Sequence, residues 1–136
     1  MSNLDWGIVR DCMRTNVTEV DGKLDVLSAL KVMKDVGATS LIVKRRDDKD
    51  EYGMLLFSDI AKNVIAKDRA PERVNVYEIM AKPVLSVRPD MQIRYCARLF
   101  EKFGISHAPV VEGGKIIGIV SFYLLVLEGL KPALGD

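Results

Sequence analysis

The chain repeats itself at a nearly constant interval, and this feature limits its possible folds most strongly. A shift of 67 residues brings valines, methionines and a glycine of the first half onto identical residues of the second. After the polar loop 44–52 the shift becomes 65, a change that a loop tolerates. Two copies of one supersecondary unit are therefore expected, at about 8–68 and 75–131. The matched pairs are Val9 and Val76, Met13 and Met80, Val17 and Val84, Val20 and Val87, Gly37 and Gly104, Val43 and Val110, Gly53 and Gly118, and Phe57 and Phe122.

Each copy has the same predicted order of elements, β-α-β-β-α. Apolar residues recur at helical spacing in one segment of each copy and form short extended runs in the others. As domains, we assign residues 1–7 to a tail, 8–70 to the first copy and 71–136 to the second, with Pro71 breaking the joint between them. The predicted elements are extended pieces at 17–20 and 84–87, helices at 24–36 and 91–103, strands at 40–44 and 108–112, returning strands at 52–57 and 115–120, and final helices beginning at Ser58 and Ser121.

The ends of the first helix in each copy carry capping signals. Gly37 and Gly104 lie where a left-handed residue ends a helix. Asp90 is predicted to cap the start of the helix in the second copy.

The final helix of the second copy, "SFYLLVLEGL", is apolar on nearly every side. Such a helix is buried in a core or against another subunit. A homodimer contact along 122–130 is one interpretation, and closure of an intramolecular interface is the other. The matching segment "SDIAKNVIAKD" is amphipathic and needs only one covered face.

Composition narrows the class of protein. The chain has 136 residues, of which 49% are hydrophobic, so it can bury a sizeable core. Twenty basic and 19 acidic residues give a net charge of +1, which argues against nucleic-acid binding and a polybasic membrane anchor. The longest apolar run, 116–127, is too short to span a bilayer. The N-terminal sequence lacks the layout of a signal peptide, so a cytoplasmic protein without a membrane partner is expected.

No arrangement of residues typical of catalysis or metal binding is visible. Cys12 and Cys96 are far apart in the sequence and form no metal-ligand motif, which is typical of a reduced protein. His107 is the single histidine, and we see no cysteine–histidine pair, carboxylate pair or phosphate-binding loop. The prediction is a protein that is not an enzyme, with no catalytic residues and no metal.

One short stretch, "EYGMLLFSDI", joins a predicted strand directly to a helix and places Ser58 beside Asp59 at the joint. Both residue types are favoured as helix caps, so capping alone accounts for them. A helix N-terminus also favours phosphate, and a carboxylate there can accept hydrogen bonds from ribose hydroxyls. Helix capping and nucleotide binding are both consistent with these two residues.

Taken together, the motifs resemble those of the cystathionine β-synthase (CBS) domain pair, or Bateman module. The similarity covers about 8–131, and the order, spacing and duplication of the motifs carry it. The motifs are "VRDCM" and "VYEIM" before each copy, "SVRPD", "GISHAPVVEGGKIIGIVS" and "GMLLFSDI".

The resemblance implies an α/β fold of the α+β type, with the two β-α-β-β-α repeats packed by pseudo-twofold symmetry. It also implies two clefts between the repeats, which in this family often bind AMP, ADP, ATP or S-adenosylmethionine and regulate a partner. Modules of this family commonly dimerise. No cofactor is required on this view, and an adenosyl compound is the regulatory ligand.

The resemblance also assigns residues to each cleft. The family pattern is Gly-apolar-apolar-Ser/Thr-x-x-Asp, in which the hydroxyl usually faces phosphate and the carboxylate usually binds ribose. Each cleft also uses the linker strand of the opposite copy. The first cleft is expected to use Asp59, Ser58, Thr39, Ser40, Val84 and Leu85, and the second, weaker cleft Ser121, His107, Ser106, Val17 and Thr18.

Neither copy has the complete pattern. The first copy has Asp59 but Leu56 at the hydroxyl position, whereas the second has Ser121 but Leu124 at the carboxylate position. Loss of a charge-assisted hydrogen bond costs about 1.5–3 kcal/mol, or about tenfold to a hundredfold in affinity. The cleft with Asp59 is therefore expected to bind a nucleoside better.

Two functions are consistent with these residues. The first is a regulatory protein that senses an adenine nucleotide in the cleft between its repeats and modulates a separate, unidentified partner. The second is a ligand-free dimerisation or protein-interaction module whose nucleotide sites have degenerated, a function that the incomplete patterns favour.

Overall fold

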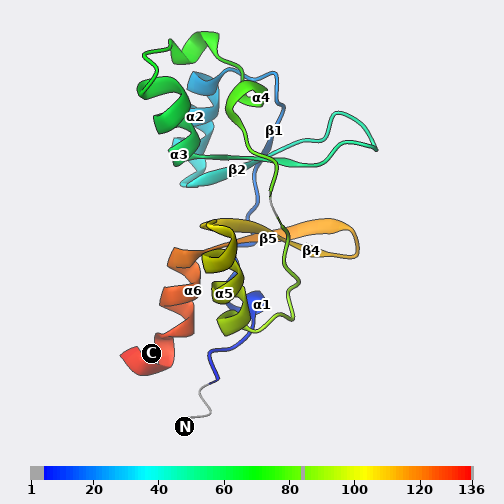
Figure 1. The fold of residues 1–136 in the computed structure, drawn as a ribbon, viewed down its shortest axis with the longest axis vertical. Coiled ribbons are helices and arrows are strands. Elements are labelled where there is room, and N and C mark those ends of the chain that lie inside the picture. Colours follow the sequence, from blue (N-terminus) through cyan, green and yellow to red (C-terminus); the bar gives the residue numbers. More distant parts are fainter. Residues whose placement is uncertain (1–4, 84, 136) are drawn as a thin grey trace. The chain divides into compact units, whose positions relative to one another are not determined.

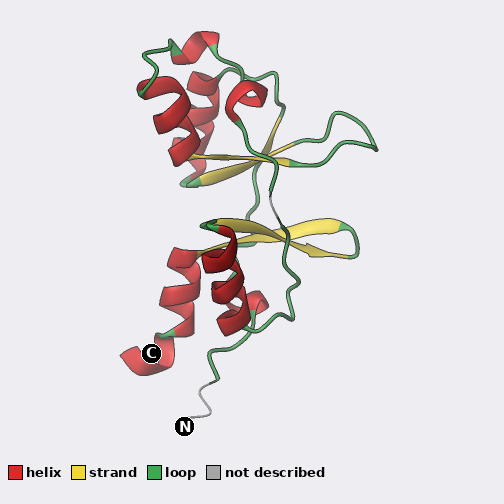
Figure 2. Ribbon diagram, viewed as in Figure 1, coloured by secondary structure: helices red, strands yellow, loops and turns green. Residues whose placement is uncertain are grey.

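The computed structural model describes residues 5–83 and 85–135 (Figures 1 and 2). The chain forms two compact units, each of mixed helix and strand. Unit 1 comprises Met1–Val17 together with Val84–Asp136, and unit 2 comprises Thr18–Pro83. Each unit has its own buried core, as expected for two copies of an α+β unit.

Unit 2 contains a three-stranded sheet with helices packed against it. The strand order is β1-β2-β3, with β1 and β2 parallel and β2 and β3 antiparallel. The predicted β-α-β-β-α order is confirmed here. The elements are β1 Glu19–Val20, α2 Val26–Val36, β2 Ser40–Val43, β3 Gly53–Leu56, α3 Phe57–Ile60, the π-helix η1 Ala61–Ile65, the 3₁₀ helix η2 Pro71–Arg73 and α4 Val76–Ile79.

Helix α2 forms where the sequence has a cap, an apolar stripe and a glycine in order. The Asp25 carboxylate accepts a hydrogen bond from the Ser28 backbone N–H at 2.9 Å, which satisfies a free donor of the first turn. Ala29 and Met33, four residues apart, are both buried. Gly37 ends the helix with φ of 69°, a left-handed conformation that glycine adopts without strain.

Unit 1 repeats this order around a two-stranded sheet. The extended piece before its first helix forms an isolated parallel bridge, between Val87 and Val110, in place of a named strand. Gly113 and Gly114, at φ of 60° and 77°, make the tight turn between β4 and β5. The elements are α1 Val9–Cys12, α5 Ile93–Phe103, β4 His107–Glu112, β5 Lys115–Ser121, α6 Phe122–Gly129 and α7 Lys131–Leu134.

The short helix that precedes each copy belongs to the unit of the other copy. The backbone N–H of Val9, in α1, donates to the Met91 carbonyl at 2.8 Å, and α1 packs against α6 in unit 1. The backbone N–H of Val26 donates to the Val74 carbonyl, just before α4, at 2.8 Å in unit 2. The compact units therefore cross the boundaries of the sequence repeats at 8–70 and 71–136, which remain a description of the sequence.

Two predicted helix starts are corrected by the structure. Helix α5 begins at Ile93 with Gln92 as its N-cap, so the prediction of Asp90 as the cap is wrong. Asp90 lies two residues before that N-cap, and its carboxylate pairs with Arg88 at 3.1 Å. The final helix of the first copy begins at Phe57, so Ser58 lies inside its first turn.

Helix α6 is apolar on both its packed and its exposed faces. Leu125 and Gly129 face the core of unit 1 and are buried. Five large apolar side chains of the same segment are 37–69% exposed within the chain, namely Phe122, Tyr123, Val126, Leu127 and Leu130. Among the described residues, no helix combines the length and the apolar character needed to cross a bilayer.

Candidate functional site

In unit 2 the structure places four of the six residues predicted for the first cleft at one end of the sheet, namely Thr39, Ser40, Ser58 and Asp59. Ser40 begins β2 and pairs with Leu56, the last residue of β3, so the strand–helix joint lies beside it. Ser40 is buried, whereas Thr39 and Ser58 are exposed. A nucleoside at this end of the sheet would meet backbone, two hydroxyls on the surface and one carboxylate.

That carboxylate belongs to Asp59, which is half-buried in the first turn of α3. Its Oδ2 accepts a hydrogen bond from the Leu56 backbone N–H at 2.8 Å. This bond is the return half of a capping box, because Asp59 is the third residue of the helix and Leu56 is the N-cap. A carboxylate has about four acceptor positions, so this bond does not exhaust its capacity.

In unit 1 three of the five residues predicted for the second cleft also lie together, namely Ser106, His107 and Ser121. His107 and Ser121 are opposite each other in the pairing of β4 with β5. The hydroxyl of Ser121, which is buried, accepts a hydrogen bond from the Leu124 backbone N–H at 3.2 Å. Ser106 Oγ lies 2.9 Å from His107 Nδ1, and the tautomer of the ring decides which group donates.

Each of the two strand–helix joints has one half of the capping-box pattern, and the halves differ between the units. Unit 1 has the hydroxyl of the N-cap in Ser121 and lacks a carboxylate at Leu124, whereas unit 2 has Asp59 and lacks a hydroxyl at Leu56. Each remaining polar group makes the local backbone bond that a capping box assigns to it. Helix capping thus uses the same atoms that the family pattern assigns to ligand.

The linker residues of the predicted clefts are distributed over both units. Val17 and Leu85 belong to unit 1 and Thr18 belongs to unit 2, where its carbonyl accepts the Ile42 backbone N–H at 2.9 Å. Val84 lies outside the described residues. The contribution of these four residues to a ligand site stays a prediction.

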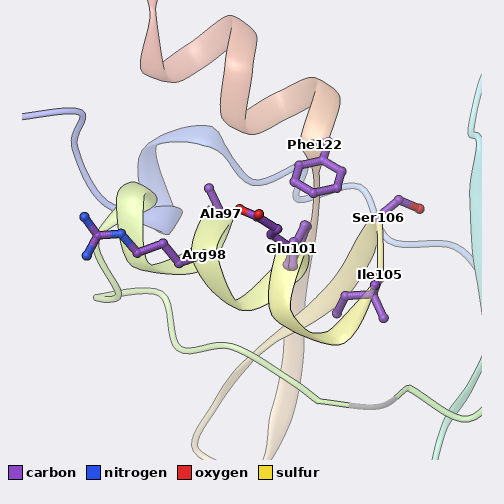
Figure 3. A pocket seen from close by; sticks show the side chains of 8 residues that line it. Ala97, Arg98, Glu101, Ile105, Ser106 and Phe122 are labelled. Atoms are coloured by element: carbon purple, nitrogen blue, oxygen red, sulfur yellow. The ribbon is translucent and has the colours of Figure 1, made fainter.

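Ser106 lies at the edge of an open hollow of about 590 Å³ on unit 1 (Figure 3). The hollow is mostly apolar, and its aromatic rings, those of Phe100 and Phe122, meet edge to face with centroids 5.2 Å apart. Figure 3 shows Phe122 above α5, with Arg98 and Ser106 on opposite sides of the hollow. Its remaining lining residues are Ala97, Glu101, Gly104 and Ile105.

A second cavity, of about 670 Å³, lies wholly within unit 2 and was not anticipated from the sequence. It is lined by the turn Asp21–Lys23, by 43–46 at the end of β2, and by Tyr77, Met80 and Lys82 of the segment around α4. Periodicity cannot reveal such a cavity because its three walls are distant in the chain. The signal available was the loop 44–52, which is longer and more charged than its counterpart.

The shifted pKa values of the two units have different causes. In unit 2 the Asp25 and Glu78 carboxyl pKa values are lowered, first by the Ser28 hydroxyl and the Asn75 backbone N–H respectively. The pKa of Asp50 is held far below its usual value, mainly by the Arg46 backbone N–H and then by the Lys82 ammonium.

In unit 1 the shifts affect the two thiols. Burial raises the pKa of the Cys12 thiol to about 12 and that of Cys96 to about 11. Both are free cysteines in the core of the unit, and the Cys12 thiol donates to the Val9 carbonyl at 3.4 Å. They are packing residues in the thiol form. Over the described residues, no group of three or more histidines, cysteines and carboxylates is placed to hold a metal ion.

Comparison with known proteins identifies the fold. The model of the CBS domain matches residues 9–66 and 76–126, which is most of the chain in two segments. The chain therefore belongs to the CBS domain family and carries the domain twice, as the internal repeat predicts.

Solved structures support the same assignment. The hexameric CBS-CP12 protein from bloom-forming cyanobacteria is 36% identical, with a TM-score of 0.85 over 90% of this chain and 70% of that chain. A putative signal-transduction protein with CBS domains from Burkholderia ambifaria is 29% identical, with a TM-score of 0.74 over 90% of this chain and 85% of that chain. The first of these two proteins is a hexamer, and the second is named for signal transduction.

Curated relatives are longer than this chain. A homoserine O-acetyltransferase of Methanosalsum zhilinae is 35% identical over 113 residues, which are 82% of this chain and 22% of the enzyme. An uncharacterised protein of Methanopyrus kandleri is 32% identical over 91 residues, or 65% of this chain and 45% of that protein. The chain spans less than half the length of these relatives, and the similarity to the acetyltransferase is confined to about a fifth of that enzyme.

Proposed function

We propose that the chain is a regulatory CBS-pair protein that senses an adenine nucleotide and modulates a separate partner. The observation that carries the proposal is the placement of Asp59 beside Ser40 and the Leu56 backbone at one end of the unit 2 sheet. A carboxylate at a helix start can accept both ribose hydroxyls while backbone N–H groups approach a phosphate.

The proposed mechanism is a shift between two arrangements of the chain. Ligand changes the population of an arrangement only to the extent that it binds that arrangement better. The ligand is an adenosyl compound such as AMP, ADP, ATP or S-adenosylmethionine, and the partner is a different protein. Membership of the family supports this proposal, as does the similarity to a protein that is named for signal transduction.

The test is isothermal titration calorimetry with AMP, ADP, ATP, NAD and S-adenosylmethionine. Asp59→Ala should weaken binding by about tenfold to a hundredfold because it removes a charge-assisted interaction. Glu78→Ala is the matched control, since Glu78 fills the same capping position in α4 of the same unit and bonds to the Asn75 backbone N–H at 2.7 Å.

The two variants separate ligand binding from helix capping. Equal losses of affinity in both would assign the effect of Asp59 to the stability of unit 2. An absence of binding for all five compounds at millimolar concentration would refute the nucleotide proposal.

A second function, a ligand-free interaction module, is favoured by the exposed apolar side chains of α6. On this proposal Asp59 and Ser121 serve as caps, and the segment 122–130 docks a second copy or another protein. Apolar side chains exposed on one segment commonly mark an interaction surface.

Val126→Lys tests this function because Val126 is 52% exposed, whereas neighbouring Leu125 is buried and would report on folding instead. The variant should lower the molar mass measured by light scattering while leaving the melting temperature of the monomer nearly unchanged. Ile65→Lys, at a residue that is 74% exposed in unit 2, is the control. An unchanged molar mass for Val126→Lys would contradict the interaction through α6.

A further inference from the structure

The cavity of about 670 Å³ in unit 2 lies at the opposite end of the sheet from Asp59. Strand β2 runs from Ser40, which pairs with Leu56 at the Asp59 end, to Val43, which pairs with Gly53 and lines the cavity. Three residues of strand separate the two ends by about 10 Å. The cavity is therefore a different place from the strand–helix joint of the proposed nucleotide site.

The walls of this cavity are held together by backbone contacts. The Tyr77 backbone N–H donates to the Gly22 carbonyl at 2.9 Å, which ties α4 to the turn after β1. The Lys44 backbone N–H donates to the Val20 carbonyl at 2.9 Å, which ties the end of β2 to the last residue of β1, directly before that turn. A Cβ at Gly22 would lie 3.2 Å from the Tyr77 Cβ, so the turn approaches the helix as closely as glycine allows.

The lining of the cavity is strongly basic. It carries one carboxylate, that of Asp21, against five basic side chains. A second carboxylate, that of Asp50, pairs with Arg46 at 3.3 Å and with Lys82 at 3.0 Å. The five basic residues are Lys23, Lys44, Arg45, Arg46 and Lys82.

Three of these cations have no carboxylate partner within the described residues. Lys23 and Lys44 take part in no ion pair there, and Arg45 lies over the Tyr52 ring at 5.2 Å from its centroid. Cations gathered around one cavity repel each other, and a multiply charged anion relieves that repulsion.

The equivalent place in unit 1 shows that the fold does not require this charge. The repeat shift of 67 makes Arg10 the equivalent of Tyr77 and Glu112 the equivalent of Arg45. In unit 1, Arg10 and Glu112 form an ion pair at 2.7 Å. By the same shift, Arg88 is the equivalent of Asp21 and Asp90 is the equivalent of Lys23. Arg88 and Asp90 pair with each other at 3.1 Å. At this end of the sheet unit 1 pairs its basic side chains with carboxylates, whereas unit 2 has an excess of basic side chains.

We propose that the cavity binds a small phosphorylated molecule with at least two phosphate charges. Lysine and arginine are the side chains that proteins use for phosphate. Val43, Met80 and the Tyr77 ring add an apolar wall for the organic part of the ligand, and the volume lies within the range of small-molecule sites.

The test is calorimetric titration of the full chain with sodium pyrophosphate at 150 mM salt. Lys23→Gln with Lys44→Gln should weaken binding at least tenfold. Lys31→Gln with Lys34→Gln removes the same charge from exposed positions of α2 in the same unit and should leave affinity within twofold. Arg45→Glu, which installs the residue type of Glu112, should also weaken binding at least tenfold.

The proposal is overturned by an absence of measurable binding at 5 mM pyrophosphate, or by equal weakening of binding in both lysine pairs. Tighter binding of a 20-nucleotide RNA that is lost in the same variants would also overturn it, because the cavity would then belong to a nucleic-acid surface. Asp59→Ala should leave pyrophosphate binding unchanged. Loss of binding in that variant would assign the anion to the strand–helix joint, and so the failure of this proposal is separable from that of the proposed nucleotide site.

Discussion

Unit 2 and unit 1 share one order of elements, but their titratable groups are perturbed in opposite directions. In unit 2 the carboxyl pKa values of Asp25, Asp50 and Glu78 are lowered by hydrogen bonds to turns and caps. In unit 1 burial raises the thiol pKa values of Cys12 and Cys96. The comparison teaches that a duplicated fold retains its apolar and glycine positions, while the polar side chains that cap its helices and turns diverge.

Helix caps illustrate this divergence. Asp25 caps α2 through the Ser28 N–H, but its repeat equivalent, Gln92, makes no side-chain capping bond. The C-terminal ends of the same helices have stayed alike, because Gly37 and Gly104 both hold a left-handed conformation. A left-handed residue constrains the side chain severely, whereas an N-cap has several solutions.

The largest expected effect comes from burying a charge in one unit at a time. Val9→Asp and Val76→Asp act at repeat-equivalent residues that are both fully buried, and each should cost its own unit at least about 3 kcal/mol. Trp6, the single tryptophan, reports on unit 1 by fluorescence, and amide exchange of 18–83 reports on unit 2. If Val76→Asp shifted the Trp6 transition as far as Val9→Asp does, the two units would unfold as one.

The second expected effect is protection of the thiols of unit 1. With a pKa of about 11, Cys96 carries about 100-fold less thiolate at pH 8 than a thiol at the ordinary value of 9.0. Iodoacetamide labelling followed by mass spectrometry should show this protection, which urea should remove.

The sign of the pH effect on unit 1 follows from these raised pKa values. The folded state favours the protonated thiol, so the stabilisation is fully present below about pH 9 and is lost as pH rises toward about 11 and 12. Labelling of folded protein at the rate seen in urea would contradict the burial of these side chains.

Acid should destabilise unit 2 before unit 1. Its lowered carboxyl pKa values mean that the stabilisation is present above the unfolded values near 4 and is lost as pH falls through the lower folded values. Amide protection factors, which correct for the slower intrinsic exchange in acid, should fall first within 18–83 as the pH drops from 5 to 3. Asp25→Ala should remove part of this acid sensitivity, whereas Gln92→Ala should leave the acid sensitivity of both units unchanged. Equal effects of the two substitutions would contradict the proposed difference between the units.

The smallest effect distinguishes the two serines at the strand–helix joints. Ser121→Ala should cost about 1 kcal/mol because its hydroxyl caps α6. Ser58→Ala, at an exposed position inside the first turn of α3, should stay within about 0.5 kcal/mol of the parent protein. Urea titrations of both variants provide the measurement, and a larger loss for Ser58→Ala would reverse the assignment of the caps.

Most of the fold follows from the sequence because local signals repeat. The shift of 67 residues, the glycines that end α2 and α5, and the polar loop before β3 indicate the elements in both copies. The prediction of Asp90 as a cap was wrong because α5 begins two residues later than the favoured capping type indicates, with Gln92 as an N-cap that makes no side-chain capping bond.

The candidate site was harder to predict, and its ligand remains a proposal. The pairing of Ser40 with Leu56 follows from strand register, and so the grouping of residues around Asp59 was accessible from the pattern. The packing of α1 and α4 into the unit of the other copy could not be predicted, because periodicity describes one segment at a time. The basic cavity escaped notice for the same reason, since Lys23, Lys44 and Lys82 come from three separate segments.

The division of the chain has a consequence for its biosynthesis. Unit 2 is one continuous stretch, Thr18–Pro83, and can form as soon as that stretch leaves the ribosome. Unit 1 needs the segments on both sides of unit 2, since α1 packs against α6, so α1 waits for residues that are translated after unit 2. A nascent chain that has just exposed Pro83 would thus hold a folded unit 2 next to an N-terminal segment that still lacks its partner.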